Sequence, residues 1–305
     1  MADGLTVVAL GGNALLRKGE RGTAAEQRAN LADTFEAIAP LLRGTPVVLT
    51  HGNGPQVGNV LLRQELGSAE APPLPLYLAV AQTQAEIGAL MASEITPAAG
   101  REAVVVLTRV VVAADDPAFA SPSKPVGPFY DAAQAEELEG ERGWQMREDA
   151  GRGWRRVVPS PRPLEILELE SVRALLATGA VTVACGGGGI PVVRREGRAD
   201  GVDAVIDKDH ASALLATGLG ADRLLILTQV SAVERDFGTP DAEPLRQLSP
   251  ARDEGLLGDL PAGSMRPKVE AAFAFVRETG GEATITSAEA LRNGEAGTTI
   301  VPASA

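Results

Sequence analysis

The chain has 305 residues, with 28 basic and 40 acidic side chains, a formal net charge of -12, one cysteine and two histidines. So few Cys and His residues exclude soft-ligand zinc, iron–sulfur and haem sites, as well as a disulfide framework within the chain. The acidic balance argues against nucleic acid as a partner, because neutralising phosphates needs a basic face.

Short apolar runs alternate along the chain with longer segments of helical period. We expect strands at Leu5–Leu10, Val47–Thr50, Ala103–Val112, Val181–Cys185, Leu224–Thr228, Thr284–Thr286 and Thr298–Val301. We expect helical faces at Leu31, Phe35, Ile38 and Leu42, at Ile87, Leu90 and Met91, at Ala211, Leu214, Leu215 and Gly218, and at Val269, Ala272, Phe273 and Val276. Near-continuous apolar strands are typical of a parallel sheet covered on both faces. The pattern predicts a three-layer αβα sandwich with a mainly parallel central sheet, as a single α/β domain over residues 1–305.

One stretch, from about Asp115 to Pro163, breaks this alternation. It contains many prolines and both tryptophans, and it is far longer than an ordinary loop of about 4–6 residues. We interpret residues 115–163 as a small inserted subdomain that protrudes from the sheet. Trp144, Trp154, Phe129 and Tyr130 could form its core. The alternative is a disordered surface excursion.

The sequence predicts no membrane segment. No apolar run approaches the 18 residues that span a bilayer, and Thr108 and Arg109 interrupt the run from Val104 to Ala114. The chain enters a strand pattern directly after Gly4, which leaves no room for a basic leader and an apolar segment. We therefore expect a cytoplasmic protein.

Three glycine clusters directly follow predicted strands: Gly11-Gly12-Asn13, Gly52-Asn53-Gly54-Pro55 and Gly186 to Gly189. In open α/β sheets, ligands bind beyond the carboxyl ends of the strands, where glycine permits close approach and helix-starting amides hold anions. Any one cluster could simply make a turn, but three at one edge favour an anion site. The P-loop spacing is absent, because no cluster is followed by Lys-Ser or Lys-Thr at the right offset. The dinucleotide fingerprint G-x-G-x-x-G also fails, because Gly52 and Gly54 are followed by Gly58, one residue late.

Lysine occurs only at positions 18, 124, 208 and 268. Lys208 and Lys268 lie near predicted helix starts, with Ser264 as a possible N-cap, and Lys124 lies in a proline-framed loop. A cation at a helix start opposes the helix dipole unless an anion is bound there. Each lysine alone could be a solvated surface residue, but together they favour phosphate binding.

Other reactive side chains are interpreted as structural. We expect His51 to be hydrogen-bonded within its turn, His210 to face solvent or the helix surface, and Cys185 to be a small core residue rather than a nucleophile. No metal site is expected among the protein's own residues. Asp209 could orient the lysines or be an ordinary acid of a first helical turn.

The chain resembles the carbamate kinases of the amino-acid-kinase superfamily over nearly its full length. The matching segments are Val7–Ala14, Thr50–Asn59, Lys124–Phe129, Glu148–Pro161, Cys185–Val192, Val205–Asp209 and Gly263–Met265. The segment with the prolines and tryptophans matches the family's protruding subdomain, which distinguishes carbamate kinases from acetylglutamate and uridylate kinases.

This resemblance implies reversible phosphoryl transfer between ATP and carbamate, with Mg²⁺ accompanying ATP, in a homodimer. It also implies arginine or purine catabolism, often in the direction of ATP formation. By motif, Gly11, Gly12, Asn13, Gly52, Asn53 and Gly54 would hold carbamate and the transferring phosphoryl group. Lys124 would reach carbamoyl phosphate, Lys208 and Lys268 would contact the nucleotide phosphates, and Asp209 would orient these two lysines. Met265 is expected to pack near the nucleotide.

Two features leave the details open. Arg266 adds a cation beside Lys268, where it could bind phosphate or face water, and Thr228–Val233 departs from the Asp-Gly pattern of related branches, so base selectivity is open. The alternatives are a kinase that acts on another small carboxylate and a non-catalytic metabolite sensor. A structural or interaction protein is the weakest interpretation.

Overall fold

An eight-stranded sheet in the order β15-β17-β16-β12-β1-β2-β9-β3 forms the centre of the molecule. The computed structural model describes residues 4–148 and 153–303. The strands of this sheet are β1 (Thr6–Leu10), β2 (Val47–His51), β3 (Ala103–Val105), β9 (Val181–Val183), β12 (Arg223–Thr228), β15 (Gln247–Leu248), β16 (Glu282–Ser287) and β17 (Thr298–Ile300). Neighbouring strands run parallel, with β16 and β17 as the antiparallel pair. The prediction of a mainly parallel central sheet is confirmed.

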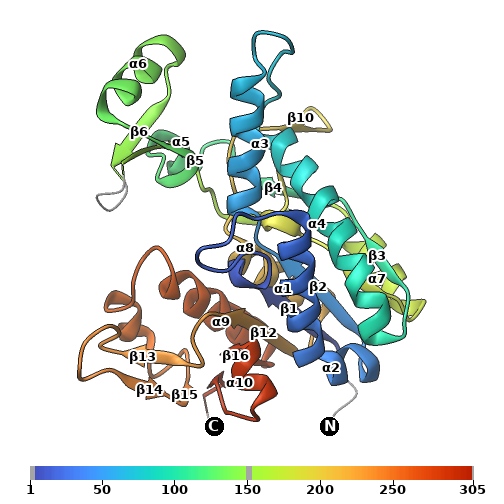
Figure 1. The fold of residues 1–305 in the computed structure, drawn as a ribbon. Coiled ribbons are helices and arrows are strands. Elements are labelled where there is room, and N and C mark those ends of the chain that lie inside the picture. Colours follow the sequence, from blue (N-terminus) through green and yellow to red (C-terminus); the bar gives the residue numbers. More distant parts are fainter. Residues whose placement is uncertain (1–3, 149–152, 304–305) are drawn as a thin grey trace.

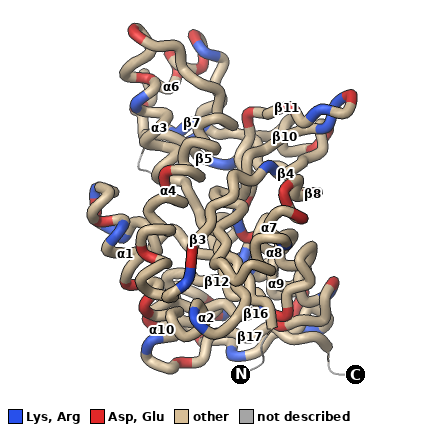
Figure 2. Tube along the Cα trace, turned by 90° about the vertical axis from the view of Figure 1, so that its right-hand side faces the viewer, with Lys and Arg blue, Asp and Glu red and all other residues tan. Residues whose placement is uncertain are grey.

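Helices cover both faces of this sheet (Figure 1). One layer contains α1 (Ala24–Ala37), α2 (Ala39–Gly44) and α4 (Leu76–Ala99), and the other contains α7 (Leu169–Ala177), α8 (Lys208–Leu219) and α9 (Met265–Thr279). Figure 2 shows α1 on one side of the sheet and α8 and α9 on the other. Because side chains alternate along a strand, Val8 packs in one cluster with Phe35 of α1, and Val7 packs in another with Phe273 of α9. This explains why the strands are apolar on both faces.

The apolar run Ala103–Val112 does not form one strand, so that prediction is wrong. It divides into β3 in the central sheet and β4 (Arg109–Val112) in a second sheet of order β11-β10-β4-β8. The other strands of the second sheet are β8 (Pro163–Ile166), β10 (Ile190–Arg195) and β11 (Arg198–Gly201). At the break, the Thr108 backbone N–H donates to Oε1 of Gln84 at 2.9 Å, and the Thr108 carbonyl accepts from Nε2 of the same side chain at 3.2 Å. These two bonds hold Thr108 against α4 and turn the chain from one sheet to the other.

The segment 115–163 contains a small sheet of its own, in the order β5-β7-β6. Its elements are α5 (Pro117–Ala120), β5 (Lys124–Tyr130), α6 (Ala132–Arg142), β6 (Gln145–Glu148) and β7 (Trp154–Val158). In Figure 1, α6 and β6 stand away from the central sheet. Tyr130, Trp144 and Trp154 surround a small apolar core, whereas Phe129 is 45% exposed, so its predicted place in that core is wrong. That residues 115–163 form a separate subdomain stays a prediction.

The remaining elements complete the fold. They are η1 (Gly12–Ala14), α3 (Gly54–Leu66), η2 (Gly186–Gly188), β13 (Val233–Arg235), β14 (Glu243–Leu245), η3 (Glu254–Gly258) and α10 (Ala288–Arg292). Within the described residues, none of the helices combines the length and the hydropathy that a bilayer crossing requires. Residues 149–152 of the Glu148–Pro161 motif lie outside the described residues.

Gly88 allows α4 to pack closely against β3, because a Cβ at this position would lie 2.4 Å from Cγ1 of Val105. We expect Gly88→Ala to lower the free energy of unfolding by about 1–3 kcal/mol through overpacking. Gly140 in α6 is the matched control, since a Cβ there meets no atom within 4 Å. Gly140→Ala should raise stability by about 0.5–1 kcal/mol through helix propensity. Denaturant unfolding measures both changes, and a stabilising Gly88→Ala would contradict this packing.

Candidate active site

Three glycine turns meet at one edge of the central sheet. Strands β1, β2 and β9 are parallel neighbours, so the turns that follow them share this edge. At this edge lies a cavity of about 230 Å³, lined by residues of the three turns: Gly12, Gly52, Asn53, Gly54 and Gly187. Three of the four lysines of the chain, Lys124, Lys208 and Lys268, also line it. We call this cavity the lysine cleft. Close packing requires glycine at position 187, where φ is +64° and a Cβ would lie 2.1 Å from Nδ2 of Asn53.

Helix α3 begins at the lysine cleft. Asn53 is its N-cap residue, but the Asn53 side chain makes no capping hydrogen bond and instead donates through Nδ2 to Oγ1 of Thr83 at 2.9 Å. The first backbone amides of α3 are therefore not taken up by the N-cap side chain. Such amides at a helix start form a ready site for an anion.

A buried carboxylate joins two lysines that come from different helices. Asp209, in the first turn of α8, is 2% exposed, and its Oδ1 accepts a hydrogen bond from Nζ of Lys208. Its Oδ2 accepts from Nζ of Lys268, in the first turn of α9, at 3.1 Å. Burial opposes ionisation of Asp209, but Lys208 and Lys268 outweigh it and keep the pKa of this carboxyl below its ordinary value. Two ammonium groups and one carboxylate leave a net charge of +1 facing the cleft.

The third lysine comes from the segment 115–163. Lys124 begins β5, and its Nζ donates to Oδ2 of Asp207 at 3.1 Å. Oδ1 of Asp207 accepts from the backbone N–H of Asp209 at 2.9 Å, so Asp207 also caps α8. Burial works against its charge, yet Lys124 holds the pKa of Asp207 far below its ordinary value. Sequence reasoning missed this residue, although an Asp directly before a helix is the usual N-cap signal.

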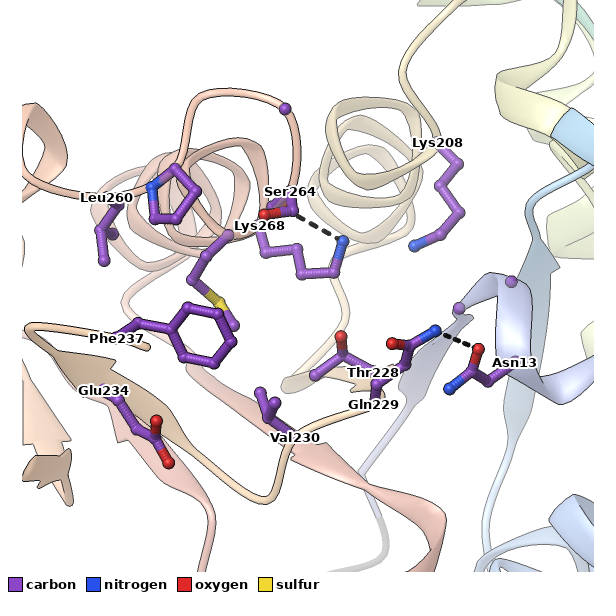
Figure 3. Close-up of a pocket in the computed structure, with 15 residues that line it drawn as sticks. Asn13, Lys208, Thr228, Gln229, Val230, Glu234, Phe237, Leu260, Ser264 and Lys268 are labelled. Atoms are coloured by element: carbon purple, nitrogen blue, oxygen red, sulfur yellow. Dashed lines mark hydrogen bonds between the residues drawn. The ribbon is translucent and has the colours of Figure 1, made fainter. Parts of the chain in front are cut away.

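A second cavity of about 320 Å³ adjoins the lysine cleft (Figure 3). We call it the adjoining cleft. Its lining residues are Gly11, Gly12, Asn13, Lys208, Thr228, Gln229, Val230, Glu234, Phe237, Leu260, Pro261, Gly263, Ser264, Met265 and Lys268. In Figure 3, Phe237 lies at the end remote from Lys208, and Nε2 of Gln229 donates to Oδ1 of Asn13. One end with an aromatic ring beside the Glu234 carboxylate and one cationic end suit a ligand that joins a flat ring to a phosphate chain.

The start of α9 differs in two respects from the sequence-based expectation. Ser264 occupies the N-cap position, but its side chain makes no capping hydrogen bond, so the predicted cap is wrong. Its backbone carbonyl instead accepts from Nζ of Lys268 at 3.3 Å. Arg266 donates through Nη2 to the carbonyl of Gly258 at 2.9 Å and through Nε to that of Leu260 at 3.2 Å. Arg266 therefore fastens the preceding loop and is not directed into the cleft.

Known proteins are similar to this chain in sequence and in fold. A model of the amino acid kinase family matches residues 4–287. A carbamate kinase from Halobacterium salinarum is 45% identical over 304 residues, which cover 98% of each chain. The chain belongs to the amino acid kinase family, among its carbamate kinases.

Solved structures of carbamate kinases agree with this assignment. The structure of carbamate kinase from Giardia lamblia bound to AMP-PNP matches with a TM-score of 0.91 and 39% identity, covering 99% of each chain. A carbamate kinase from Pyrococcus horikoshii is 43% identical over 310 residues, or 97% of this chain and 98% of its own. The resemblance and the fold class that the sequence predicts are both confirmed.

Two buried groups beside the glycine turns have the structural character that the sequence predicts. His51 is 1% exposed, its Nδ1 lies 3.0 Å from the Gly52 carbonyl oxygen, and burial lowers its pKa to about 4. Cys185 is fully buried, and burial raises the pKa of its thiol. A neutral imidazole and a protonated thiol contribute packing at this edge of the sheet.

His210 does not face solvent or the open helix surface, so that expectation is wrong. Its side chain is only 14% exposed, with Nε2 at 2.6 Å from Nη1 of Arg162 and 3.5 Å from Oε2 of Glu270. Burial and the Arg162 guanidinium lower the pKa of His210. Arg162 lies 48 residues before His210 in the sequence and packs against it on α8. Helical periodicity does not reveal a contact of this kind.

The buried, neutral His51 should make stability depend on pH. Between its unfolded pKa, near 6.5, and its folded pKa, about 4, the unfolded chain binds a proton that the folded chain excludes. Stability from this group is therefore lost as pH falls through that window, by about 3 kcal/mol in total. We expect His51→Gln to flatten the pH dependence of the unfolding free energy between pH 6.5 and 4. An unchanged slope in denaturant unfolding would contradict the neutral state of His51.

Proposed function

We propose that this chain catalyses reversible phosphoryl transfer between ATP and carbamate, so that carbamoyl phosphate and ADP give ATP and carbamate. Its family supports an ATP-dependent kinase. The observation that carries the assignment of residues is the Asp209 carboxylate, which holds Lys208 and Lys268 where the two clefts meet.

Each cleft receives one part of the reaction in this proposal. Carbamate and the transferring phosphoryl group bind at the first two glycine turns, through Gly11, Gly12, Asn13, Gly52, Asn53 and Gly54. Lys124 contacts carbamoyl phosphate, whereas Lys208 and Lys268 contact the nucleotide phosphates. The nucleoside enters the adjoining cleft, which Met265 lines.

The transfer requires no covalent enzyme intermediate. A carbamate oxygen attacks the γ-phosphorus of ATP, a new P–O bond forms, and the bond to the bridging oxygen breaks as ADP leaves with its electron pair. Carbamate is already an anion, so the protein removes no proton, and Asp209 orients the lysines rather than acting as a base. A loose transition state spreads charge over three oxygens, and the ammonium groups of Lys124, Lys208 and Lys268 stabilise that charge.

Mg²⁺ is expected to accompany ATP, where it would neutralise charge on the β- and γ-phosphates. Asp207 and Asp209 do not fit a direct metal site, because both accept hydrogen bonds from lysine ammonium groups. Among residues 4–148 and 153–303, no three His, Cys, Asp or Glu side chains gather as a metal site. In this proposal phosphate oxygens and water hold the ion.

A homodimer, a cytoplasmic location and a role in arginine or purine catabolism complete the proposal, and they rest on the family resemblance.

Two alternatives keep the same fold. One is a kinase whose acceptor is another small carboxylate, and the other is a sensor that binds the ligands without transfer. Three lysines around one cleft favour catalysis, since a sensor needs no cation for a transition state.

Removing any one site lysine should slow the chemical step. We expect Lys124→Met, Lys208→Met and Lys268→Met each to lower kcat by about 10²–10³-fold, the usual cost of one charge-stabilising donor. Lys18 is the matched control, because it is exposed and lies outside both clefts. A coupled assay of ATP formation from ADP and carbamoyl phosphate measures these rates, and normal turnover by all three variants would refute the mechanism.

The identity of the acceptor is tested by competition. With ATP in excess, carbamate should be phosphorylated, whereas acetylglutamate, aspartate and UMP should yield no phosphorylated product. Faster turnover of one of these three would assign the chain to another acceptor. Tight binding of ATP and carbamoyl phosphate in calorimetry without any ATP formation would instead favour the sensor.

A further inference from the structure

Strand β5 and helix α3 lie along each other and link two parts of the site. Helix α3 starts at Gly54 in the lysine cleft, and β5 starts at Lys124 in the same cleft. The part of α3 from Gly54 to Glu65 and the whole of β5 each cover roughly 16–20 Å. Their far ends therefore meet again, at Glu65 and Tyr130. Midway, a Cβ at Gly58 would contact Cα of Gly127 at 3.7 Å, which shows how closely the two elements approach.

The far end of this pair is joined through polar groups. The Tyr130 hydroxyl donates to Oε2 of Glu65 at 2.7 Å, and Nη1 of Arg142, at the end of α6, lies 3.5 Å from Oε1 of the same carboxylate. These three residues line a cavity of about 570 Å³ between α3 and the segment 115–163. The Glu65 carboxylate therefore bridges α3 and the segment 115–163 beside this cavity.

The near end is held differently. Val126 of β5 shares a small apolar cluster with Val57 of α3 and Val205. Strand β5 also pairs with β7, and its Lys124 pairs with Asp207, so several contacts hold this end. A second contact, at the far end, is needed to fix the direction of the paired strands along α3. Glu65 supplies that second contact, at the opposite end of β5 from Lys124.

We propose that Glu65 and Tyr130 are positioning residues, which fix β5 along α3 and thereby place the Lys124 ammonium over the acceptor site. This inference rests on the role of Lys124 given above. Burial and the Glu65 carboxylate raise the pKa of Tyr130, so its hydroxyl remains a donor throughout the working range of pH. Lys208 and Lys268 lie on α8 and α9, and their hydrogen bonds go to Asp209 and Ser264 rather than to Glu65 or Tyr130.

A double-mutant cycle tests the proposal on the full-length chain. Glu65→Gln and Tyr130→Phe should each lower kcat/KM for carbamoyl phosphate about tenfold, as expected for losing one hydrogen bond to a charged group. The KM for ADP should stay unchanged, because the nucleotide lysines are held elsewhere. In a Lys124→Met background, neither substitution should cause a further loss. Glu165→Gln is the matched control, since it breaks the carboxylate–arginine pair with Arg194 at 2.5 Å in the second sheet.

The outcomes separate this inference from the proposed function. The positioning role would be overturned if Glu65→Gln and Tyr130→Phe lowered kcat/KM equally with Lys or Met at position 124, or in neither background. A matching rise in the KM for ADP would also overturn it. The Tyr130→Phe variant keeps the test valid if Glu65→Gln lowers the melting temperature. Full activity of Lys124→Met alone would refute the assignment of Lys124, which belongs to the proposed function.

Discussion

The contact of one buried carboxylate with two ammonium groups organises this site. Two lysines so close together would repel each other in a half-buried cleft, and burial already lowers the pKa of Lys208. The Asp209 carboxylate opposes both effects, because it accepts a hydrogen bond from each lysine while it is itself almost fully buried. The net charge of +1 then remains available to phosphate. This resolves the contrast between a chain of net charge -12 and a polyanionic ligand, since recognition depends on the local charge.

The fold explains why these groups meet. Parallel strands deliver their following turns to one edge of the sheet, and two helices start there with lysines in their first turns. Asp207 connects the parts, because one of its oxygens caps α8 and the other accepts from Lys124 of β5. The same carboxylate thus links the helix that bears Lys208 and Asp209 to the segment 115–163.

Local sequence patterns were sufficient for most strands of the central sheet, for the glycine turns and for selecting the scarce lysines as candidate site residues. They failed where a distant residue decides the structure. Gln84 breaks the run Ala103–Val112 through hydrogen bonds to Thr108, and no hydrophobic pattern contains that information. His210 is covered by Arg162, and the partner of Lys124 lies 83 residues away. Contacts of this kind follow from topology, which periodicity alone does not specify.

The central claim is that Lys208 and Lys268, held by Asp209, stabilise the transferring phosphoryl group. A crystal structure with MgADP, an aluminium fluoride mimic of that group and carbamate tests this claim most directly. The account predicts that both ammonium nitrogens lie about 2.7–2.9 Å from oxygens of the nucleotide or fluorines of the mimic, with Asp209 still in contact with both lysines. A complex in which the mimic binds away from both lysines would contradict it.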